Sequence, residues 1–323
     1  MRITKKYLLL TAAASIILGG TIFTAAGCSV GWDFTKIGTA NYQTSTHVLD
    51  ETFQNISIDT TTVDVYFLPS DDATAKVICK EEVKLPHVVT VENGTLNIKE
   101  TNERSWYDNI SFFGVGDTSV TVYLPQSTYA NLSIDISTGD IAISQGFTFD
   151  SIDIQGSTCD VECYASTTNT LTVKVSTGDI KLENASVGSL SLTARTGDMK
   201  ITGVTVANDF THSVTTGDTK ISNVACKNFT STGNTGKLTM VSLIATEKMS
   251  IGRSTGDVTF EGCDAGEILV ETSTGDVTGT LLTTKNFHAS SSSGEVKVPD
   301  SITGGTCKIT CSTGDIKITV IEN

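Results

Sequence analysis

The chain has 323 residues, a net charge of −14, 18% charged residues and 38% hydrophobic residues. The hydrophobic fraction is too high for a disordered chain. The charge argues against nucleic-acid binding, because phosphate contacts need a basic surface and no Lys or Arg cluster occurs beyond residue 6.

Residues 1–27 have the pattern of a membrane-targeting segment. Arg2, Lys5 and Lys6 precede an apolar run of about 20 residues, the length of a membrane-spanning helix. The positive-inside rule predicts that the N-terminal basic residues stay in the cytoplasm and that the chain after the apolar run is exported. An uncleaved single-pass anchor, a lipoprotein signal that ends at a lipidated Cys28, and plain secretion all remain open. The first two tether the chain to the extracytoplasmic face of a bacterial cell membrane.

The next part of the chain is predicted as a linker over residues 28–52 and an N-terminal β cap over residues 53–129. Residues 88–98 are expected to form a β-hairpin around Asn93-Gly94, a dipeptide favoured in type I′ turns. The cap also contains one degenerate copy of the repeat that follows. In that copy Ile56 aligns with Leu132, 76 residues later.

Residues 130–323 contain ten copies of a 19–20-residue repeat with the consensus Ser-Thr-Gly-Asp. Apolar residues alternate with Ser, Thr, Asp and Lys around each turn, which is typical of β-strands. Each copy is predicted as a strand, a tight turn, a second strand, a loose corner and a short third strand. One copy cannot bury its own apolar face, so the copies are expected to stack as rungs about 4.8 Å apart in a parallel β-solenoid.

The turn residues of this repeat are assigned a structural role. Glycine adopts the positive φ that a sharp turn needs, and the following Asp is expected to accept backbone N–H groups. Cys159 replaces the glycine in one copy and Lys237 replaces the Asp in another, which predicts that no single turn residue is indispensable. The assigned residues are Gly139, Asp140, Gly178, Asp179, Gly197, Asp198, Gly217, Asp218, Gly256, Asp257, Gly275, Asp276, Gly314 and Asp315.

The cysteines of the repeat are predicted to be free and buried. Cys159 and Cys163, like Cys307 and Cys311, are four residues apart, which is about 13 Å along a strand and too far for a disulfide. Most of them fall at inward positions, where a thiol behaves as a small hydrophobic group. No His/Cys cluster has the spacing of metal ligands, so neither a metal nor another cofactor is expected.

The Asp column is the remaining candidate for a site. Stacked carboxylates repel one another, and Ca²⁺ would relieve this repulsion. However, Ca²⁺ takes six to eight oxygen ligands, and the Gly-Gly-x-Gly-x-Asp repeat of calcium-binding β-rolls is absent. Turn capping is therefore favoured. His212 and Arg253 also fall at inward positions, where a local distortion of the rung or a snorkelling side chain is expected.

Catalysis is not expected of this chain. β-Helical polysaccharide enzymes build their clefts from long loops between strands, and a constant spacing of 19–20 residues leaves no room for such loops. The sequence offers no Ser/His/Asp or paired-carboxylate arrangement. Both tryptophans, Trp32 and Trp106, lie outside the repeat, so a sugar-stacking platform on it would lack its best residue.

Residues 31–36, 53–59, 91–96 and 120–125, together with the Ser-Thr-Gly-Asp copies, resemble a known family. This is the bacterial "putative adhesin" β-strand-repeat family, a domain of unknown function, and the resemblance covers about residues 30–323. It implies a right-handed single-stranded β-helix on the outside of a bacterial envelope, in many members behind one N-terminal membrane helix. The family offers no catalytic residues.

The sequence therefore predicts an all-β protein: a right-handed, single-stranded parallel β-helix of about ten rungs with an N-terminal β cap. The predicted function is a non-enzymatic, membrane-tethered extracellular adhesion or interaction module of a bacterial cell envelope. Its partner would be a cell-wall, host-surface or envelope protein ligand, without nucleic acid. One alternative, motivated by the resemblance, is an accessory component of an envelope-stress sensing system. The other is a β-helical carbohydrate-active enzyme.

Overall fold

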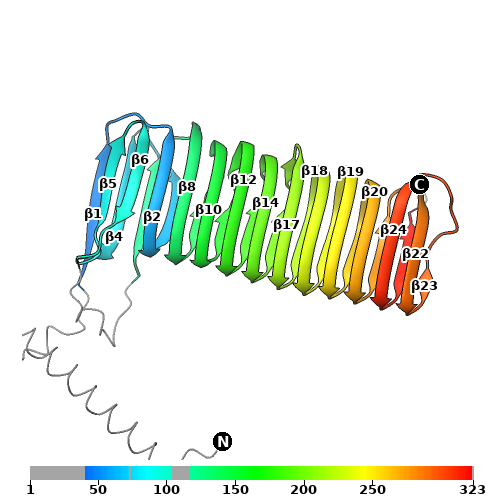
Figure 1. Cartoon of the computed structure of the whole chain (residues 1–323). Helices are drawn as coiled ribbons and strands as arrows, with labels where there is room; N and C mark the ends of the chain where they lie inside the picture. Colours follow the sequence, from blue (N-terminus) through cyan, green and yellow to red (C-terminus); the bar gives the residue numbers. More distant parts are fainter. Residues whose placement is uncertain (1–40, 73, 104–116, 322–323) are drawn as a thin grey trace, which may run out of the picture.

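A computed structural model describes residues 41–72, 74–103 and 117–321, which form a rod of stacked strands (Figure 1). The predicted membrane segment 1–27, with Cys28, lies outside the described residues. None of the described residues belongs to a helix that is long and apolar enough to cross a membrane.

The strands of the N-terminal region are β1 (Tyr42–Leu49), β2 (Asn55–Thr62), β3 (Asp64–Pro69), β4 (Ala75–Glu82), β5 (His87–Glu92), β6 (Thr95–Glu100) and β7 (Ser119–Leu124). Those of the first repeats are β8 (Thr128–Thr138), β9 (Ile141–Ile143), β10 (Thr148–Thr158), β11 (Val161–Cys163), β12 (Ser166–Thr177), β13 (Ile180–Glu183), β14 (Ser186–Thr196), β15 (Met199–Thr202) and β16 (Thr205–Val206). The remaining strands are β17 (Asp209–Thr216), β18 (Thr219–Thr235), β19 (Leu238–Thr255), β20 (Val258–Thr274), β21 (Val277–Leu281), β22 (Lys285–Ser293), β23 (Val296–Lys297), β24 (Gly305–Thr313) and β25 (Ile316–Val320).

Neighbouring rungs pair in parallel at the spacing of the repeat, which confirms the β-solenoid. Leu132 pairs with Ile152, Ile152 with Leu171, and Leu171 with Leu190. These side chains are buried while the residues between them face outward. A register shift separates the short third strand from the long strand that follows, as between Phe149 and Ser151. An extra residue in one rung bends the strand at this shift. The sequence predicts the loose corner before the third strand, at residues 144–147 between β9 and β10, so the shift is a further bend that it did not predict.

The core is a continuous column of Ile, Leu and Val with several buried phenylalanines. Phe210 and Phe229 occupy the same position in successive rungs, and their ring centroids lie 5.1 Å apart. Phe147, Phe149 and Phe260 are also buried. Identical positions stack at the strand spacing, so each large side chain packs on the corresponding residue of the next rung.

All seven cysteines in the described residues are free and buried, which confirms the prediction for the six cysteines of the repeat. Burial raises the pKa of the Cys163 thiol to about 11 and that of the Cys226 thiol to about 12. These thiols therefore remain protonated at neutral pH and pack as small hydrophobic groups.

The degenerate rung predicted before the repeat is present as β2–β3. Ile56 pairs with Leu132 and Val65 with Ile141, both 76 residues apart, in the predicted register. The predicted hairpin is confirmed as β5–β6, with positive φ at Asn93 and Gly94. The predicted linker over residues 28–52 is wrong in its last part, because β1 pairs antiparallel with β4. Its alternation is too weakly apolar to mark a strand in the sequence.

Chain order and spatial order differ at both ends of the rod. Strands β2 and β3 lie between the β6–β7 rung and the β8–β9 rung. At the other end β24 pairs with both β20 and β22, so the last rung in the sequence is inserted before the preceding one. Figure 1 shows the resulting order β20, β24, β22. The C-terminal end of the rod is therefore formed by β22 and β23.

His212 and Arg253 are neither snorkelling nor signs of a distorted rung, so that interpretation was wrong. His212 is fully buried, with Nδ1 3.0 Å from Ser231 Oγ and Nε2 2.9 Å from Thr219 Oγ1. Arg253 donates from Nη2 to Ser231 Oγ over 3.1 Å. Its Nε and Nη1 atoms are buried without a hydrogen-bond partner among the described residues. Burial lowers the pKa of Arg253 to about 10.

Gly233 makes room for Arg253 in the core. A Cβ atom at Gly233 would lie 1.8 Å from Nη1 of Arg253.

We expect Arg253→Met to raise the free energy of unfolding by about 1–4 kcal/mol, because it replaces a poorly paired buried charge by an apolar side chain of similar length. Gly233→Ala should destabilise the native chain by about 1–3 kcal/mol through overpacking. Guanidinium chloride unfolding of both single variants and the double variant measures the coupling, and additive effects would contradict this explanation.

Candidate functional site: a charged groove and an open end

The turn glycines are required by both backbone conformation and space. Gly197 has φ +145° and Gly217 has φ +147°. A Cβ atom at Gly217 would lie 1.9 Å from the carbonyl oxygen of Gly197 in the adjacent rung. No side chain fits there unless the stacked rungs separate. The prediction that no single turn residue is indispensable is therefore wrong for these glycines.

The one copy without a turn glycine uses a compensating glycine elsewhere. Cys159 is buried and has no positive φ. Its Sγ atom occupies the space beside Gly156, where an added Cβ would lie 2.1 Å from the sulfur. Cys159 can therefore replace a turn glycine only because Gly156, three positions earlier, leaves room for its sulfur.

The Asp residues after the glycines link each rung to its neighbour. Asp160 Oδ1 accepts the backbone N–H of Asp179 over 2.7 Å, and Asp198 Oδ1 accepts that of Asp218, also over 2.7 Å. The same bond continues from Asp218 to the backbone N–H of Lys237. Lys237 has no carboxylate to extend the series. The Asp column therefore caps backbone groups between rungs, whereas the sequence placed this capping at the turn itself.

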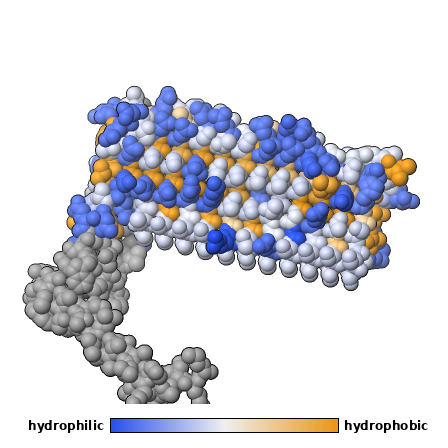
Figure 2. All heavy atoms as spheres, viewed as in Figure 1, coloured by the Kyte–Doolittle hydropathy of each residue, from blue (hydrophilic) through white to orange (hydrophobic). Residues whose placement is uncertain are grey.

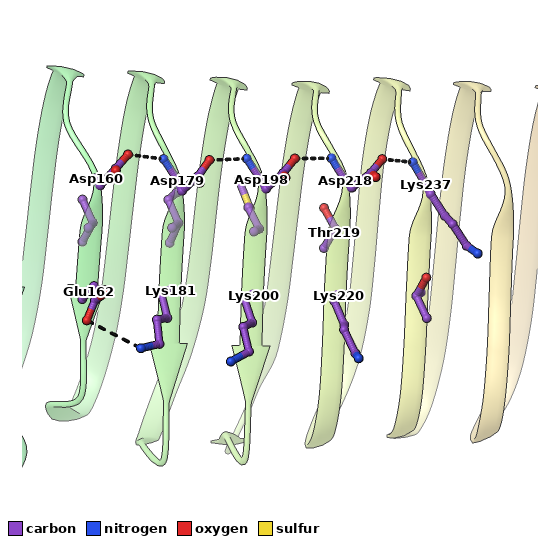
Figure 3. A pocket seen from close by; sticks show the side chains of 14 residues that line it. Asp160, Glu162, Asp179, Lys181, Asp198, Lys200, Asp218, Thr219, Lys220 and Lys237 are labelled. Carbon is purple, nitrogen blue, oxygen red and sulfur yellow. Dashed lines mark hydrogen bonds and ion pairs between the residues drawn. The ribbon is translucent and has the colours of Figure 1, made fainter.

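A charged groove runs along this column on the surface of β11, β13, β15 and β18, with a volume of about 520 Å³. The Asp ladder forms one side, and lysines from β13, β15 and β18 lie along the other (Figure 3). Lys181 contacts Tyr164 Oη over 2.6 Å, and Lys200 pairs with Glu183 over 2.8 Å. For Lys220 no ion pair is present with any residue that the structure describes. The groove offers parallel rows of carboxylates and amines at the rung spacing.

We expect Asp198→Ala to lower the free energy of unfolding by about 1 kcal/mol, because the exposed N–H of Asp218 loses one charge-assisted acceptor. Asp198→Asn keeps an acceptor oxygen and should retain most of the stability. Guanidinium chloride unfolding measures both. An Asn variant as unstable as the Ala variant would show that the charge, rather than the hydrogen bond, matters.

Exposed large apolar side chains gather at the two ends of the rod. Tyr42, Val48, Val83 and Val88 lie in the N-terminal cap, and Leu282, Val296, Ile302 and Ile321 lie in the C-terminal region. Between these groups, the described residues contain no exposed large hydrophobic side chain. Ile302 is 86% exposed. Figure 2 shows apolar surface at the C-terminal end of the rod.

Sequence reasoning missed a cluster formed by Cys79, Glu81 and His87. Cys79 and Glu81 face the same side of β4, and His87 begins β5. Their ligand atoms lie within 4.8 Å of one another, and all three residues are buried. The statement that no cluster has metal-ligand spacing was therefore wrong. The sequence did contain a signal for this cluster. Cys79 and Glu81 stand at alternate positions of one strand, and His87 follows after a turn that contains a proline.

Several solved structures are similar to this chain, and the first of the three that follow shares its fold. A "putative adhesin" from Parabacteroides distasonis is 11% identical, covers 87% of this chain and 98% of its own, and has a TM-score of 0.52. A "putative adhesin" from Bacteroides fragilis is 15% identical, covers 87% and 99%, and has a TM-score of 0.43. A "putative lipid binding protein" from Parabacteroides distasonis is 18% identical, covers 74% and 95%, and has a TM-score of 0.48.

Among curated protein sequences, none matches the chain. The Toastrack DUF4097 family matches residues 53–211 and 205–323, which include the degenerate rung and every copy of the repeat. The match therefore spans the structural unit described above. The chain belongs to the Toastrack DUF4097 family.

Proposed function

We propose that the chain is a non-enzymatic, membrane-tethered extracellular interaction module of a bacterial cell envelope, and that it contacts its partner through the C-terminal end of the rod. The observation that carries this proposal is the open end formed by β22 and β23. Within the described residues, β22 pairs with β24 and β23 with β25, each on one side only. The other edge of β22 offers unpaired backbone groups.

The apolar residues at this end support the same proposal. Val296 is 40% exposed and Ile302 is 86% exposed. An unpaired strand beside exposed apolar side chains can accept an extended segment by strand addition, in which backbone hydrogen bonds supply affinity and side-chain contacts supply specificity. The described chain enters the rod at β1, at the opposite end (Figure 1). A tether at the N-terminus would thus present β22 and β23 away from the membrane.

Binding of the purified full chain to isolated bacterial cell walls, to host-matrix proteins and to envelope proteins tests the proposal. We expect Ile302→Asp to weaken binding to the recognised material at least tenfold. Thr230→Asp adds the same charge at an exposed position on the side of the rod and is the matched control. Binding to none of these materials, or equal binding by both variants, would contradict the proposal.

A further inference from the structure

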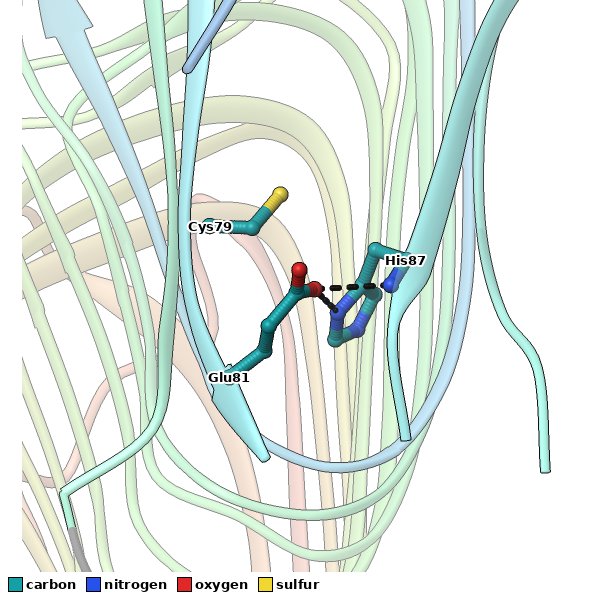
Figure 4. A group of neighbouring side chains, drawn as sticks. All are labelled: Cys79, Glu81 and His87. Carbon is teal, nitrogen blue, oxygen red and sulfur yellow. Dashed lines mark hydrogen bonds and ion pairs between the residues drawn. The ribbon is translucent and has the colours of Figure 1, made fainter. Parts of the chain in front are cut away.

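The strongest unassigned feature lies in the N-terminal cap, where Cys79, Glu81 and His87 converge (Figure 4). Within the described part of the chain, these residues form the one group of three or more His, Cys, Asp or Glu ligands packed so closely. The other buried cysteines belong to no such group. A thiolate, an imidazole and a carboxylate together are a donor set that Zn²⁺ uses.

The hydrogen bonds around His87 direct one ring nitrogen toward Glu81. His87 Nδ1 lies 2.9 Å from Glu81 Oε2, and His87 Nε2 lies 3.0 Å from Thr60 Oγ1. Thr60 donates its single hydroxyl proton to Glu100 Oε2 over 3.2 Å. When Thr60 directs its proton to Glu100, it accepts a hydrogen bond from His87 Nε2–H, which is one of the two tautomers that this contact permits. A partner on the far nitrogen that fixes the tautomer is the usual arrangement for a metal-ligating histidine.

In that tautomer Nδ1 and the Glu81 carboxylate are two acceptors that face each other, 2.9 Å apart. A metal ion bound to both would join them, as would a proton on Nδ1. The backbone N–H of His87 also donates to Glu81 Oε2 over 2.7 Å, and Ser45 donates to Oε1 over 3.1 Å. Gln43 donates to Oε1 over 3.3 Å. These bonds hold the carboxylate in place whichever cation is present.

We propose that Cys79, Glu81 and His87 bind one Zn²⁺ ion or a similar divalent transition metal. In a tetrahedral zinc site, metal–ligand distances of about 2.0–2.3 Å place the ligand atoms roughly 3.3–3.6 Å apart. Movements of about 1 Å would bring the present atoms to that spacing. Thiolate, carboxylate and neutral imidazole balance the charge of the ion, so the filled site is neutral where charge is most costly.

Binding displaces the proton of the Cys79 thiol to solvent, and the sulfur then coordinates as a thiolate. Burial, followed by the nearby Glu81 charge, raises the pKa of the free Cys79 thiol to about 12, so the uncoordinated thiol is protonated at neutral pH. The ion would join β4, which supplies Cys79 and Glu81, to β5, which supplies His87. It would fasten the cap, and it is independent of the partner contact proposed at the opposite end.

A titration of the purified, metal-free full chain with Co²⁺ tests the proposal, because Co²⁺ bound to a thiolate absorbs in the near ultraviolet. We expect one Co²⁺ per chain, displacement by Zn²⁺ and a higher Tm with Zn²⁺. Cys79→Ser should abolish the thiolate band and weaken Zn²⁺ binding at least tenfold. Cys263→Ser is the matched control, since Cys263 is buried and its sulfur contacts backbone carbonyl oxygens instead.

Alkylation of the unaltered chain, located by mass spectrometry, avoids any loss of folding in the variant. Zn²⁺ should slow modification of Cys79 at least tenfold and leave that of Cys263 unchanged. No thiolate band, a band that persists in Cys79→Ser, or equal protection of both cysteines would overturn the metal site. In those cases a proton alone would join His87 to Glu81.

Discussion

Gly217→Ala is expected to lower the free energy of unfolding by about 2–6 kcal/mol. The new Cβ atom would meet the carbonyl oxygen of Gly197 at 1.9 Å, at a φ of +147° that side chains rarely adopt. Backbone strain of this kind costs about 1–3 kcal/mol, and overpacking against a fixed backbone adds about 1–3 kcal/mol. Guanidinium chloride unfolding followed by circular dichroism measures the loss.

Gly252→Ala is the matched control for this substitution. Gly252 lies within β19, lacks a positive φ, and has no atom within 4 Å of an added Cβ. Alanine there should leave stability unchanged or raise it by about 0.5–1 kcal/mol, because glycine loses more backbone entropy on folding. If Gly217→Ala lowers the free energy of unfolding no more than Gly252→Ala does, the rungs can move apart to admit the new methyl group. That result would contradict the close stacking of the rungs.

Acidification is expected to destabilise the rod through His212. Burial, followed by the nearby Arg253 charge, lowers the pKa of His212 to about 3 from its ordinary value of 6.5. The unfolded chain therefore binds a proton at a pH where the folded chain does not. The contribution of His212 is fully present above pH 6.5 and is lost progressively as the pH falls toward 3. The loss is about 2 kcal/mol at pH 5 and approaches about 5 kcal/mol near pH 3.

Unfolding of the native chain and of His212→Gln between pH 7 and pH 3 isolates this contribution. Removal of the buried imidazole should reduce the slope of stability against pH by about 1.4 kcal/mol per pH unit over the lower part of this range. His288→Gln removes an exposed histidine and should leave the slope unchanged. Equal slopes in all three proteins would mean that carboxylates alone govern acid unfolding.

The repeat determined the solenoid because one period sets both the residue type at each position and the length of each rung. Alternation around Gly139 and Gly178 assigns the strands, and the constant spacing forces like residues to stack. The alignment of Ile56 with Leu132 even placed a degenerate rung correctly. The same columns identified the inward cysteines, since burial follows from alternation within a strand.

The candidate sites depended on contacts that no local pattern encodes. The groove beside Asp198 needs both the ladder and the lysines of adjacent strands, whose ion pairs form across rungs. The fit of Arg253 over Gly233 is likewise a contact between rungs. Spacing alone suggested distortion at Arg253, because the sequence did not reveal which residue would lie beneath it.

Only the stacked rungs explain why the turn residues that marked the repeat are glycines, because the adjacent rung leaves no room for a Cβ atom. By itself, the sequence determined the strands, the rung period and the buried face, since each follows from alternation and turn chemistry within one copy. Tertiary structure decided the swapped order of the end rungs and the convergence of Cys79, Glu81 and His87. Both depend on which strand edge is available when distant segments pack, and a one-dimensional pattern does not specify that choice.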